Sequence, residues 1–321
     1  MPRTIVPTDQ ETLMLAFGDR AVRLTNLRKM FWNEAGLTKR DLIQYYADVS
    51  PYLLPHLADR GVTMKRFPNG AAGAFFYMKH APVSRPPWVK VCPIPHKEVI
   101  DFVMVSDLPS LLWVINLGCI DLHPWYGRCD DPDRPDVLHF DLDPGPGAEF
   151  AHVCEAALRV REMLDALTMP SFVKTSGSKG LHVYVPIARD PVQKEVWTVA
   201  KALAQDLASR HPRLVTAEYR IAKRPRGRVL VDYNQNAWGR SLASVYSVRP
   251  TPRASVSTPV TWEELERGIT IDMFRIDNVP QRLHERGDLW KGVLGNERFD
   301  LRPFISTLAR LTTPRGARSA A

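Results

Sequence analysis

The spacing of apolar residues divides the first part of the chain into strand-like and helix-like segments. Apolar and polar positions alternate over residues 12–25 around a Gly-Asp pair, which predicts a two-stranded hairpin. Apolar residues at helical spacing follow Thr38, and Asp41 lies three positions after it, so we expect a capped helix that begins at Lys39. Residues 60–125 contain short apolar runs interrupted by prolines, which predict several short strands and exclude long helices.

The next part of the chain interleaves apolar strands with amphipathic helices. Helical periodicity is clear over about 149–167 and again over about 192–209. Short apolar runs predict strands at 137–140, 181–187 and 229–233. No internal repeat is visible. We therefore expect a mixed α/β body in which strand ends that carry polar residues converge on one cleft.

Composition and charge narrow the class of protein. The chain has 321 residues, of which 45% are hydrophobic and 24% charged. These values are typical of globular proteins and exclude disorder, a collagen-like repeat or a coiled coil for the bulk of the chain. The length allows one large domain or two medium ones. The formal net charge of +8 favours a polyanionic partner such as nucleic acid.

No segment is expected to enter a membrane. The longest nearly uncharged apolar run, residues 111–120, is about half as long as a membrane-spanning helix, and no basic and apolar leader begins the chain. We therefore expect a cytoplasmic protein. From about Leu311 the chain is too poor in apolar residues to fold, so we expect its end to be disordered.

Four cysteines, Cys92, Cys119, Cys129 and Cys154, show no paired C-x-x-C spacing. This pattern argues against a disulfide framework and against a zinc ribbon. Cys119, His123 and Cys129 could begin a metal site, but a fourth ligand is not evident and buried free thiols are common.

Two aspartates stand two positions apart after the strand expected at 137–140. Residues at this spacing face the same side of a strand, so Asp141 and Asp143 can direct both carboxylates into one space. Two such charges resist joint ionisation unless a cation lies between them, and a pair of divalent ions would promote phosphoryl transfer. Asp232, at the end of another apolar strand, is the candidate third acid. Alternatively, the first two are turn aspartates that precede Pro and Gly.

A loop of small residues with one lysine follows at 175–180 and leads into a clear strand. Its glycines allow successive backbone N–H groups to converge on an anion, and Lys179 adds a positive charge. His182 shares one face of the following strand with Tyr184. The alternative is a solvent-facing Gly/Ser turn that binds nothing.

Together, three spaced motifs resemble the catalytic motifs of the archaeo-eukaryotic primase superfamily: DLDPG at 141–145, SGSKGLH at 176–182 and VDY at 231–233. The chain resembles in particular the polymerase domain of bacterial ligase D, which acts in non-homologous end joining, and its stand-alone mycobacterial-type relatives, the Prim-PolC group. The resemblance extends from about residue 22 to 294 and implies an α+β fold with central, mostly antiparallel sheets flanked by helices.

The resemblance also implies a domain organisation. Residues 1–295 would form the primase-polymerase catalytic domain, in which 12–125 bind DNA and its 5′-phosphate and 126–295 carry catalysis. Residues 296–321 would be a C-terminal extension.

The resemblance implies roles for the acids and for the lysine-bearing loop. Asp141, Asp143 and Asp232 would bind two Mn²⁺ or Mg²⁺ ions and catalyse transfer from an NTP or dNTP with release of pyrophosphate. Residues that would contact the nucleotide are Ser176, Lys179, His182, His123, Gln235 and either Arg224 or Arg226.

Two of these assignments have plain alternatives. His123 could be a packed histidine before a proline. The basic run at 223–228 could be a solvated loop that attracts phosphate only non-specifically, and Pro225 leaves the choice between Arg224 and Arg226 open.

A 5′-phosphate site is expected at the start of the first helix. The helix N-terminus would present free N–H groups and a positive dipole end, to which Lys39 adds charge. Asn26 and Lys29 lie on the preceding segment, and the matching family residues hold the 5′-phosphate across a gap. Most helix N-termini, however, bind nothing.

Basic and aromatic residues are interleaved in two segments that we expect to hold the template. Lys65 and Arg66 stand in one, and Phe75 and Phe76 in the other, where at least one ring would stack on bases. Paired phenylalanines are otherwise more often core residues. Arg249 matches a DNA-contacting arginine of the family.

The expected function is template-directed filling of short gaps with a 5′-phosphate, in end joining or excision repair, with a preference for ribonucleotides. The partner would be gapped or broken double-stranded DNA, bound by a monomer associated with the nucleoid. The chain has no K-x-D-G ligase motif, so sealing would need a separate DNA ligase, and Ku is a further expected partner. Alternatives are a primase-like de novo initiator, a metal-dependent nuclease and a non-catalytic DNA-end binder.

Overall fold

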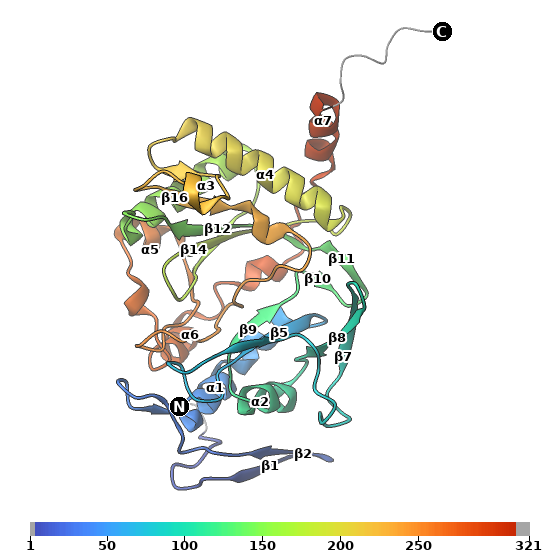
Figure 1. Ribbon diagram of the computed structural model, residues 1–321, viewed down its shortest axis with the longest axis vertical. Coiled ribbons are helices and arrows are strands. Elements are labelled where there is room, and N and C mark those ends of the chain that lie inside the picture. The colour runs from blue at the N-terminus through green and yellow to red at the C-terminus, as the bar shows by residue number, and fades with distance from the viewer. Residues whose placement is uncertain (1–3, 313–321) are drawn as a thin grey trace.

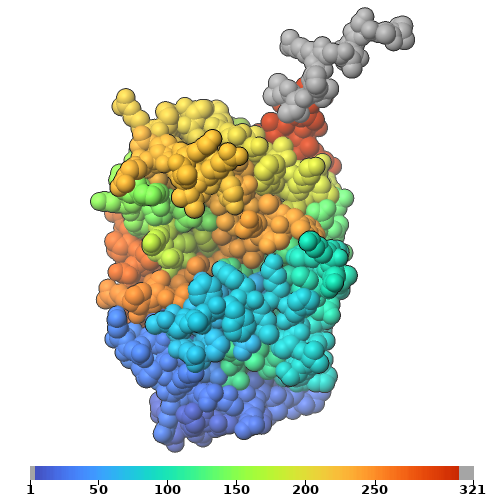
Figure 2. Space-filling model, viewed as in Figure 1, coloured from blue at the N-terminus to red at the C-terminus, as the bar shows by residue number. Residues whose placement is uncertain are grey.

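The computed structural model describes residues 4–312 and is built on two large β-sheets, one in each half of the molecule (Figure 1). A single cluster of buried apolar side chains includes residues from both halves, such as Tyr46 and Val183. Figure 2 shows the blue and cyan N-terminal half in close contact with the green, yellow and orange half. None of the helices in this described part of the chain is long and apolar enough to cross a membrane.

A six-stranded sheet forms the half that contains the three motifs. Its strands are β12 (Val137–Pro144), β13 (Phe172–Thr175), β14 (Leu181–Pro186), β15 (Val215–Thr216), β16 (Val229–Asp232) and β17 (Pro259–Val260). The order is β15-β16-β12-β14-β13-β17, and only the β15–β16 pair is parallel. Helices α3 (Phe150–Ala166) and α4 (Gln193–Arg210) pack against β12 and cover the sheet from above in Figure 1.

The N-terminal half is built on a five-stranded sheet. Its strands are β5 (Gly61–Arg66), β6 (Phe76–Met78), β7 (Val91–Pro95), β8 (Val99–Met104) and β9 (Cys119–Pro124). Strand β5 pairs with β6 and β8 and also with β9, always antiparallel. Helices α1 (Lys39–Leu57) and α2 (Leu108–Asn116) pack against each other in this half. The antiparallel, helix-flanked sheets confirm the expected fold class.

Short elements complete the described chain. The strands are β1 (Leu13–Phe17), β2 (Arg20–Leu24), β3 (Met30–Trp32), β4 (Leu37–Thr38), β10 (Gly127–Arg128) and β11 (Asp131–Pro135). The helices are α5 (Trp262–Arg267), α6 (Val279–Arg286) and α7 (Arg302–Thr312), with 3₁₀ turns η1 (Ile221–Lys223), η2 (Tyr233–Asn236), η3 (Ile271–Met273) and η4 (Lys291–Leu294).

The structure confirms the predicted hairpin, as β1 and β2, and the predicted start of α1. Thr38 caps α1 by accepting a hydrogen bond from the Asp41 N–H, and the Asp41 carboxylate accepts one from the Thr38 N–H. Helix α2 was not predicted within the segment read as short strands. Its signals are the cap by Asp107 and a proline in the first turn, where no N–H is required.

Strand β12 is longer than the strand predicted at 137–140, and the additional residues include Asp141 and Asp143. It continues to Pro144, so Asp141 and Asp143 lie within a paired strand. The interpretation of these residues as turn aspartates is therefore wrong. Leu142, between them, is fully buried and points to the opposite face of the sheet.

The expectation that the cysteines form no disulfide is also wrong. Cys92 of β7 and Cys129 of the β10–β11 turn are bonded, with their Cα atoms 5.5 Å apart and a sequence separation of 37. Local spacing could not reveal this pair because the fold alone brings the two segments together. The bond removes Cys129 from any metal site with Cys119, whose buried thiol contacts the Asp121 carbonyl oxygen at 3.2 Å.

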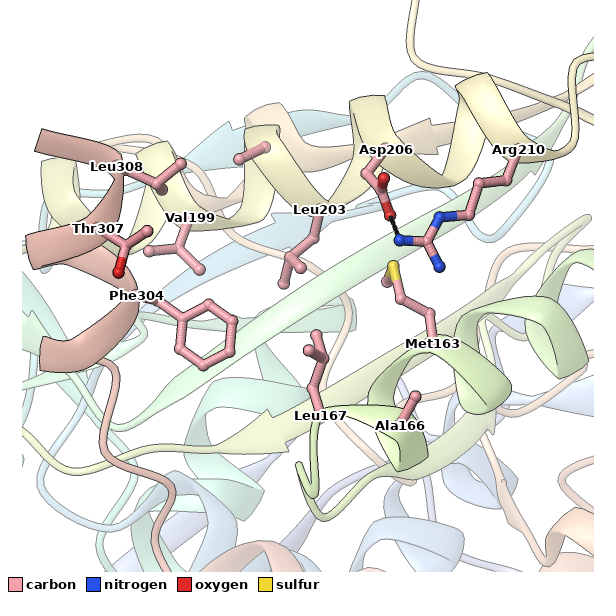
Figure 3. Close-up of a pocket in the computed structure, with 11 residues that line it drawn as sticks. Met163, Ala166, Leu167, Val199, Leu203, Asp206, Arg210, Phe304, Thr307 and Leu308 are labelled. Atoms are coloured by element: carbon pink, nitrogen blue, oxygen red, sulfur yellow. Dashed lines mark ion pairs between the residues drawn. The ribbon is translucent and has the colours of Figure 1, made fainter. Parts of the chain in front are cut away.

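Helix α7 packs beside α4 on the outer side of the C-terminal half (Figure 1). Phe304 and Leu308 of α7 face Leu203 of α4 and Leu167, next to α3, across a groove of about 430 Å³ (Figure 3). Helix α7 continues to Thr312, so the first residues of the tail that was expected to be disordered are helical. The rest of that tail lies outside the described residues.

Candidate active site

The three predicted acids lie on one face of neighbouring strands. Asp141 of β12 is the direct register partner of Asp232 of β16, which places the two side chains next to each other on the same face. Asp143 follows two residues along β12 on that face, opposite Leu230. Asp141 and Asp232 are buried, with 6% and 7% of their surface exposed, whereas Asp143 is exposed to solvent.

The proximity of these acids perturbs their ionisation. Burial, followed by the neighbouring Asp232, raises the pKa of Asp141 to about 7. The pKa of Asp143 is also raised to about 7, mainly by the charge of Asp141 and then by burial. Near neutral pH, the face therefore carries negative charge that the protein does not fully compensate.

The donor set fits a hard divalent cation, because carboxylate oxygens are the ligands that such ions prefer. The acids do not form a closed cage: within residues 4–312, no three His, Cys, Asp or Glu side chains are placed to hold a metal ion as they stand. Asp143 is diagonal to Asp232 across the ladder, at a spacing of roughly 7–8 Å between Cα atoms. A bound cation would have to draw these carboxylates closer together.

Asp232 is fixed by the turn that follows it. Its Oδ1 accepts a hydrogen bond from the Asn234 N–H at 2.9 Å, and its Oδ2 accepts one from Gln235 Nε2 at 3.0 Å. Gln235, predicted to contact the nucleotide, is thus bonded to Asp232 through its amide nitrogen.

The lysine-bearing loop lies directly against the acid-carrying strand. Ser176 Oγ accepts hydrogen bonds from the N–H groups of Ser178 and Gly180, which closes the loop tightly, and Lys179 is exposed on it. A Cβ at Gly180 would collide with the Leu142 carbonyl oxygen and lie 3.1 Å from Asp143 Oδ1. The structure therefore brings the loop and the acids together.

His182 is directed away from the loop surface. It is the register partner of Asp141 on the other side of β12, and its Nε2 lies 3.3 Å from Asp141 Oδ1. Its Nδ1 lies 2.7 Å from Nζ of Lys174, a buried lysine that the sequence analysis did not single out. Both ring nitrogens therefore have partners within the protein, unlike in a histidine that faces a nucleotide.

A further buried carboxylate, that of Asp121, contacts three predicted site residues. Its oxygens lie 3.2 Å from Arg249 Nε, 3.7 Å from His123 Nε2 and 3.9 Å from Lys65 Nζ. Burial raises the pKa of Asp121, but Arg249 and His123 outweigh it and hold that pKa below its ordinary value. The sequence signal that could have identified Asp121 is its position on an apolar strand, two residues before His123.

Arg249 also reaches the nucleotide loop. Its Nη1 donates a hydrogen bond to the Ser176 carbonyl oxygen at 3.2 Å. The side chain of Arg249 thus bridges Asp121 in the five-stranded sheet and the loop of the six-stranded sheet.

The predicted template residues form an exposed aromatic and basic surface. Phe75 and Phe76 are 51% and 44% exposed, so their interpretation as core residues is wrong. Lys65 Nζ lies 4.2 Å from the centre of the Phe75 ring, and the Arg66 guanidinium lies 5.1 Å from that of Phe76. Tyr77, which was not predicted, is 54% exposed beside them.

The predicted 5′-phosphate residues are placed differently from the expectation. The N–H of Lys39 donates to the Lys29 carbonyl oxygen and that of Arg40 to the Leu27 carbonyl oxygen, so these helix donors are not free. Lys39 Nζ points inward and bonds Thr25 O and Asn116 Oδ1. Burial lowers the pKa of Lys39 to about 8.

Asn26 and Lys29 are exposed near the start of α1. Lys29 Nζ donates to the Pro68 carbonyl oxygen and to Asn69 Oδ1, which links this segment to the loop after β5. The segment before α1 is predicted to contribute to the 5′-phosphate site. The exposed side chains of Asn26 and Lys29 are accessible for that role.

The two candidate arginines of the basic run differ in placement. Arg224 donates to the carbonyl oxygens of Glu218 and Tyr219 and folds back on its own loop, yet its charge lowers the pKa of the Asp143 carboxyl. Arg226 is exposed. The charge of Arg224 therefore acts on the acid site.

Comparisons with known proteins show which family this chain belongs to. Residues 38–290 match the model of the LigD primase-polymerase domain. The chain is 35% identical over 271 residues to the multifunctional non-homologous end joining protein LigD of Mycolicibacterium smegmatis, and 30% identical over 267 residues to the bifunctional LigD of Bacillus subtilis. These alignments cover 84% and 83% of this chain but only 35% and 43% of the two relatives.

A solved structure is similar over most of the chain. The polymerase domain of Mycobacterium tuberculosis ligase D, determined in complex with DNA, superposes with a TM-score of 0.79 at 32% identity. The match covers 85% of this chain and 97% of that domain. The chain therefore belongs to the LigD primase-polymerase domain family and is a nucleotidyltransferase.

Proposed function

We propose that this protein is a template-directed polymerase that fills short DNA gaps carrying a 5′-phosphate, in end joining or excision repair. The observation that carries the proposal is the register pairing of Asp141 with Asp232, with Asp143 and the lysine-bearing loop beside them. The relatives named above are end-joining proteins, and the similar domain was determined with DNA, which supports this substrate class.

Polymerase-type nucleotidyltransferases use a divalent metal ion and a nucleoside triphosphate. In this chain Asp141, Asp143 and Asp232 would hold two Mn²⁺ or Mg²⁺ ions, which would supply charge stabilisation at the transferring phosphoryl group. The Gln235 and Asn234 hydrogen bonds hold Asp232 in place before any ligand binds.

The nucleotide would lie between the acids and the loop. Lys179, with Arg224 or Arg226, would neutralise the triphosphate, and the backbone around Ser176 would donate to it. The contact with Asp121 would hold the His123 side chain near the nucleotide. We further propose that the sugar pocket accepts ribonucleotides.

The DNA would cross the exposed surface of β5 and β6. Phe75 and Phe76 would stack on template bases while Lys65, Arg66 and Arg249 approach the backbone. Asn26 and Lys29 would hold the downstream 5′-phosphate, with Lys39 behind them as a buried charge.

These positions assign DNA binding and catalysis to different parts of the chain. Residues 12–125 would bind DNA and 126–295 would carry catalysis within one domain of residues 1–295, with 296–321 as an extension. The protein would act as a monomer beside the nucleoid, with a separate DNA ligase and Ku as partners.

Three other functions remain to be separated by experiment. A primase-like initiator would synthesise without a primer, a nuclease would degrade the primer when nucleotides are absent, and a DNA-end binder would need no acid. A triphosphate-binding loop, as proposed for residues 175–180, would be of no use to a nuclease or a DNA-end binder.

Primer extension on gapped DNA tests the proposal directly. Wild-type protein should extend the primer with rNTPs or dNTPs when Mn²⁺ or Mg²⁺ is present. Asp141→Ala should abolish extension but retain binding to gapped DNA, whereas Glu155→Ala, an exposed acid on α3, should behave as wild type. Equal activity of Asp141→Ala and wild type would show that the acids are not catalytic.

A further inference from the structure

A polar row crosses four neighbouring strands of the six-stranded sheet. Lys174 of β13 pairs with His182 of β14, His182 pairs with Asp141 of β12, and Asp141 pairs with Asp232 of β16. Direct register partners point to the same face of a sheet, so the four side chains follow one another across it. Lys174 and His182 are 1% and 2% exposed, which places them out of reach of solvent.

Lys174 has a complete set of hydrogen-bond partners. Its Nζ lies 2.7 Å from His182 Nδ1, 3.0 Å from the Ala243 carbonyl oxygen and 2.7 Å from Ser257 Oγ. The Ser257 hydroxyl donates its own hydrogen to the Thr175 carbonyl oxygen, so it accepts from the lysine. An ammonium group has three N–H donors, and three polar atoms lie within hydrogen-bond distance of this Nζ.

The arrangement favours one position for the hydrogen of His182. With the Lys174 ammonium as donor, Nδ1 would accept, and the hydrogen of the neutral ring would reside on Nε2, which lies 3.3 Å from Asp141 Oδ1. A histidine that donates to a ligating carboxylate limits the orientations available to that carboxylate, as outer-shell groups do in other metal sites.

We propose that Lys174 is a positioning residue: it fixes His182 in the Nε2–H tautomer, and the ring in turn orients the Asp141 carboxylate for metal binding. The inference rests on the proposed function, because it assigns a metal to Asp141. It also gives His182 a role other than direct contact with the triphosphate.

A purely structural role for Lys174 is the competing explanation. The lysine ties β13 to the segments around Ala243 and Ser257, and loss of these bonds would lower stability whatever happens at the acids. The two explanations differ in whether metal affinity changes in the folded protein.

The tautomer can be measured in the unmodified protein. Histidine ¹⁵N NMR distinguishes Nε2–H from Nδ1–H, and the missing signals of His182→Asn assign the resonances. We expect the Nε2–H tautomer. The Nδ1–H tautomer would overturn the proposal, and this measurement does not depend on whether a Lys174 variant folds.

Metal affinity provides the second measurement. Lys174→Met keeps an apolar stem of similar length but removes the donors, and it should weaken Mn²⁺ binding by about 10- to 100-fold in calorimetry or EPR titration. Lys194→Met, which replaces an exposed lysine on α4, is the matched control and should bind as wild type. Thermal unfolding without metal establishes that each variant is folded.

A double variant separates the two explanations further. If Lys174 acts through His182, Lys174→Met should cause no additional loss of Mn²⁺ affinity in a His182→Asn background. Unchanged affinity of folded Lys174→Met overturns this inference alone. Absence of Mn²⁺ binding to wild-type protein overturns the proposed function and this inference with it.

Discussion

Asp141 of β12 and Asp232 of β16 occupy directly opposite positions of one antiparallel ladder, although they are 91 positions apart in the chain. Their carboxylates are held by backbone pairing, which is more rigid than a loop. The arrangement concentrates negative charge in a buried place before any cation is present. Several measurable properties follow from this placement.

The acid pair should make the metal-free protein less stable at higher pH. The pKa of folded Asp141 is about 7, above the value of about 3.9 for an unfolded aspartate. The folded state therefore binds the proton more tightly, and stability is lost as pH rises from about 4 to 7. In EDTA, Asp141→Asn should unfold at a higher temperature than wild type at pH 8, with little difference near pH 4.

Metal ions should reverse this effect. Mn²⁺ or Mg²⁺ added at pH 8 should raise the melting temperature of wild type but not of Asp141→Asn, because the cation offsets the repulsion. A melting temperature of Asp141→Asn equal to that of wild type at every pH would contradict the repulsion between Asp141 and its neighbouring acids.

Lys179→Ala should affect the nucleotide more than the DNA. A hydrogen bond to a charged group contributes about 1.5–3 kcal/mol, so the KM for the triphosphate should rise about 10- to 100-fold. Binding of gapped DNA should be unchanged. Steady-state primer extension and DNA binding by fluorescence anisotropy measure the two quantities, with the exposed Lys97→Ala as the control.

Phe75→Ala should weaken binding of the template strand. Base stacking on an aromatic ring contributes about 1–3 kcal/mol, and Phe75 is exposed beside Lys65. The Kd for single-stranded template should increase accordingly while the melting temperature stays the same. Val83→Ala, at a fully exposed apolar position, should change neither, and an equal effect of both variants would rule out stacking.

Lys29→Ala and Lys39→Met should differ in their effects on 5′-phosphate preference and on thermal stability. Lys29 is exposed, so its loss should reduce the preference for a phosphorylated over an unphosphorylated gap without loss of stability. Lys39 bonds Thr25 and Asn116 from the inside, so its loss should also lower the melting temperature. Paired binding titrations on the two gapped DNAs measure the preference, and an equal loss on both substrates would contradict the 5′-phosphate assignment.

Asp121→Asn should disturb template and nucleotide together. The carboxylate is a shared counter-ion for Lys65, His123 and Arg249, and the amide keeps its shape but not its charge. We expect a higher nucleotide KM and weaker template binding in the same variant. An effect on only one of the two would indicate that Asp121 does not link them.

Much of this site could be predicted from the sequence because its signals are local. The two-residue spacing of Asp141 and Asp143, the glycine-bearing loop and the cap of α1 each depend on neighbouring residues only. The partners that the sequence did not reveal, Lys174 and Asp121, depend on which strands lie side by side. The sequence around an isolated lysine or aspartate on an apolar strand does not show which residue of the neighbouring strand pairs with it.

The errors have the same origin. Cys92 and Cys129 become neighbours only through the fold, and the inward direction of Lys39 depends on Asn116 of α2, a helix that the sequence did not predict. By contrast, the exposed rings of Phe75 and Phe76, at the start of the short strand β6, agree with the expected template surface and not with the core alternative.

Helix α7 has a practical consequence for anyone who trims this protein to its recognisable family segment. The segment that matches the family ends at residue 290, and α7 begins at Arg302. Removal of α7 would uncover apolar side chains of α3 and α4, including Met163, Val199 and Leu203, which now face Phe304 and Leu308. A shortened version should therefore aggregate more readily, and expression plasmids for crystallisation should retain residues up to at least Thr312.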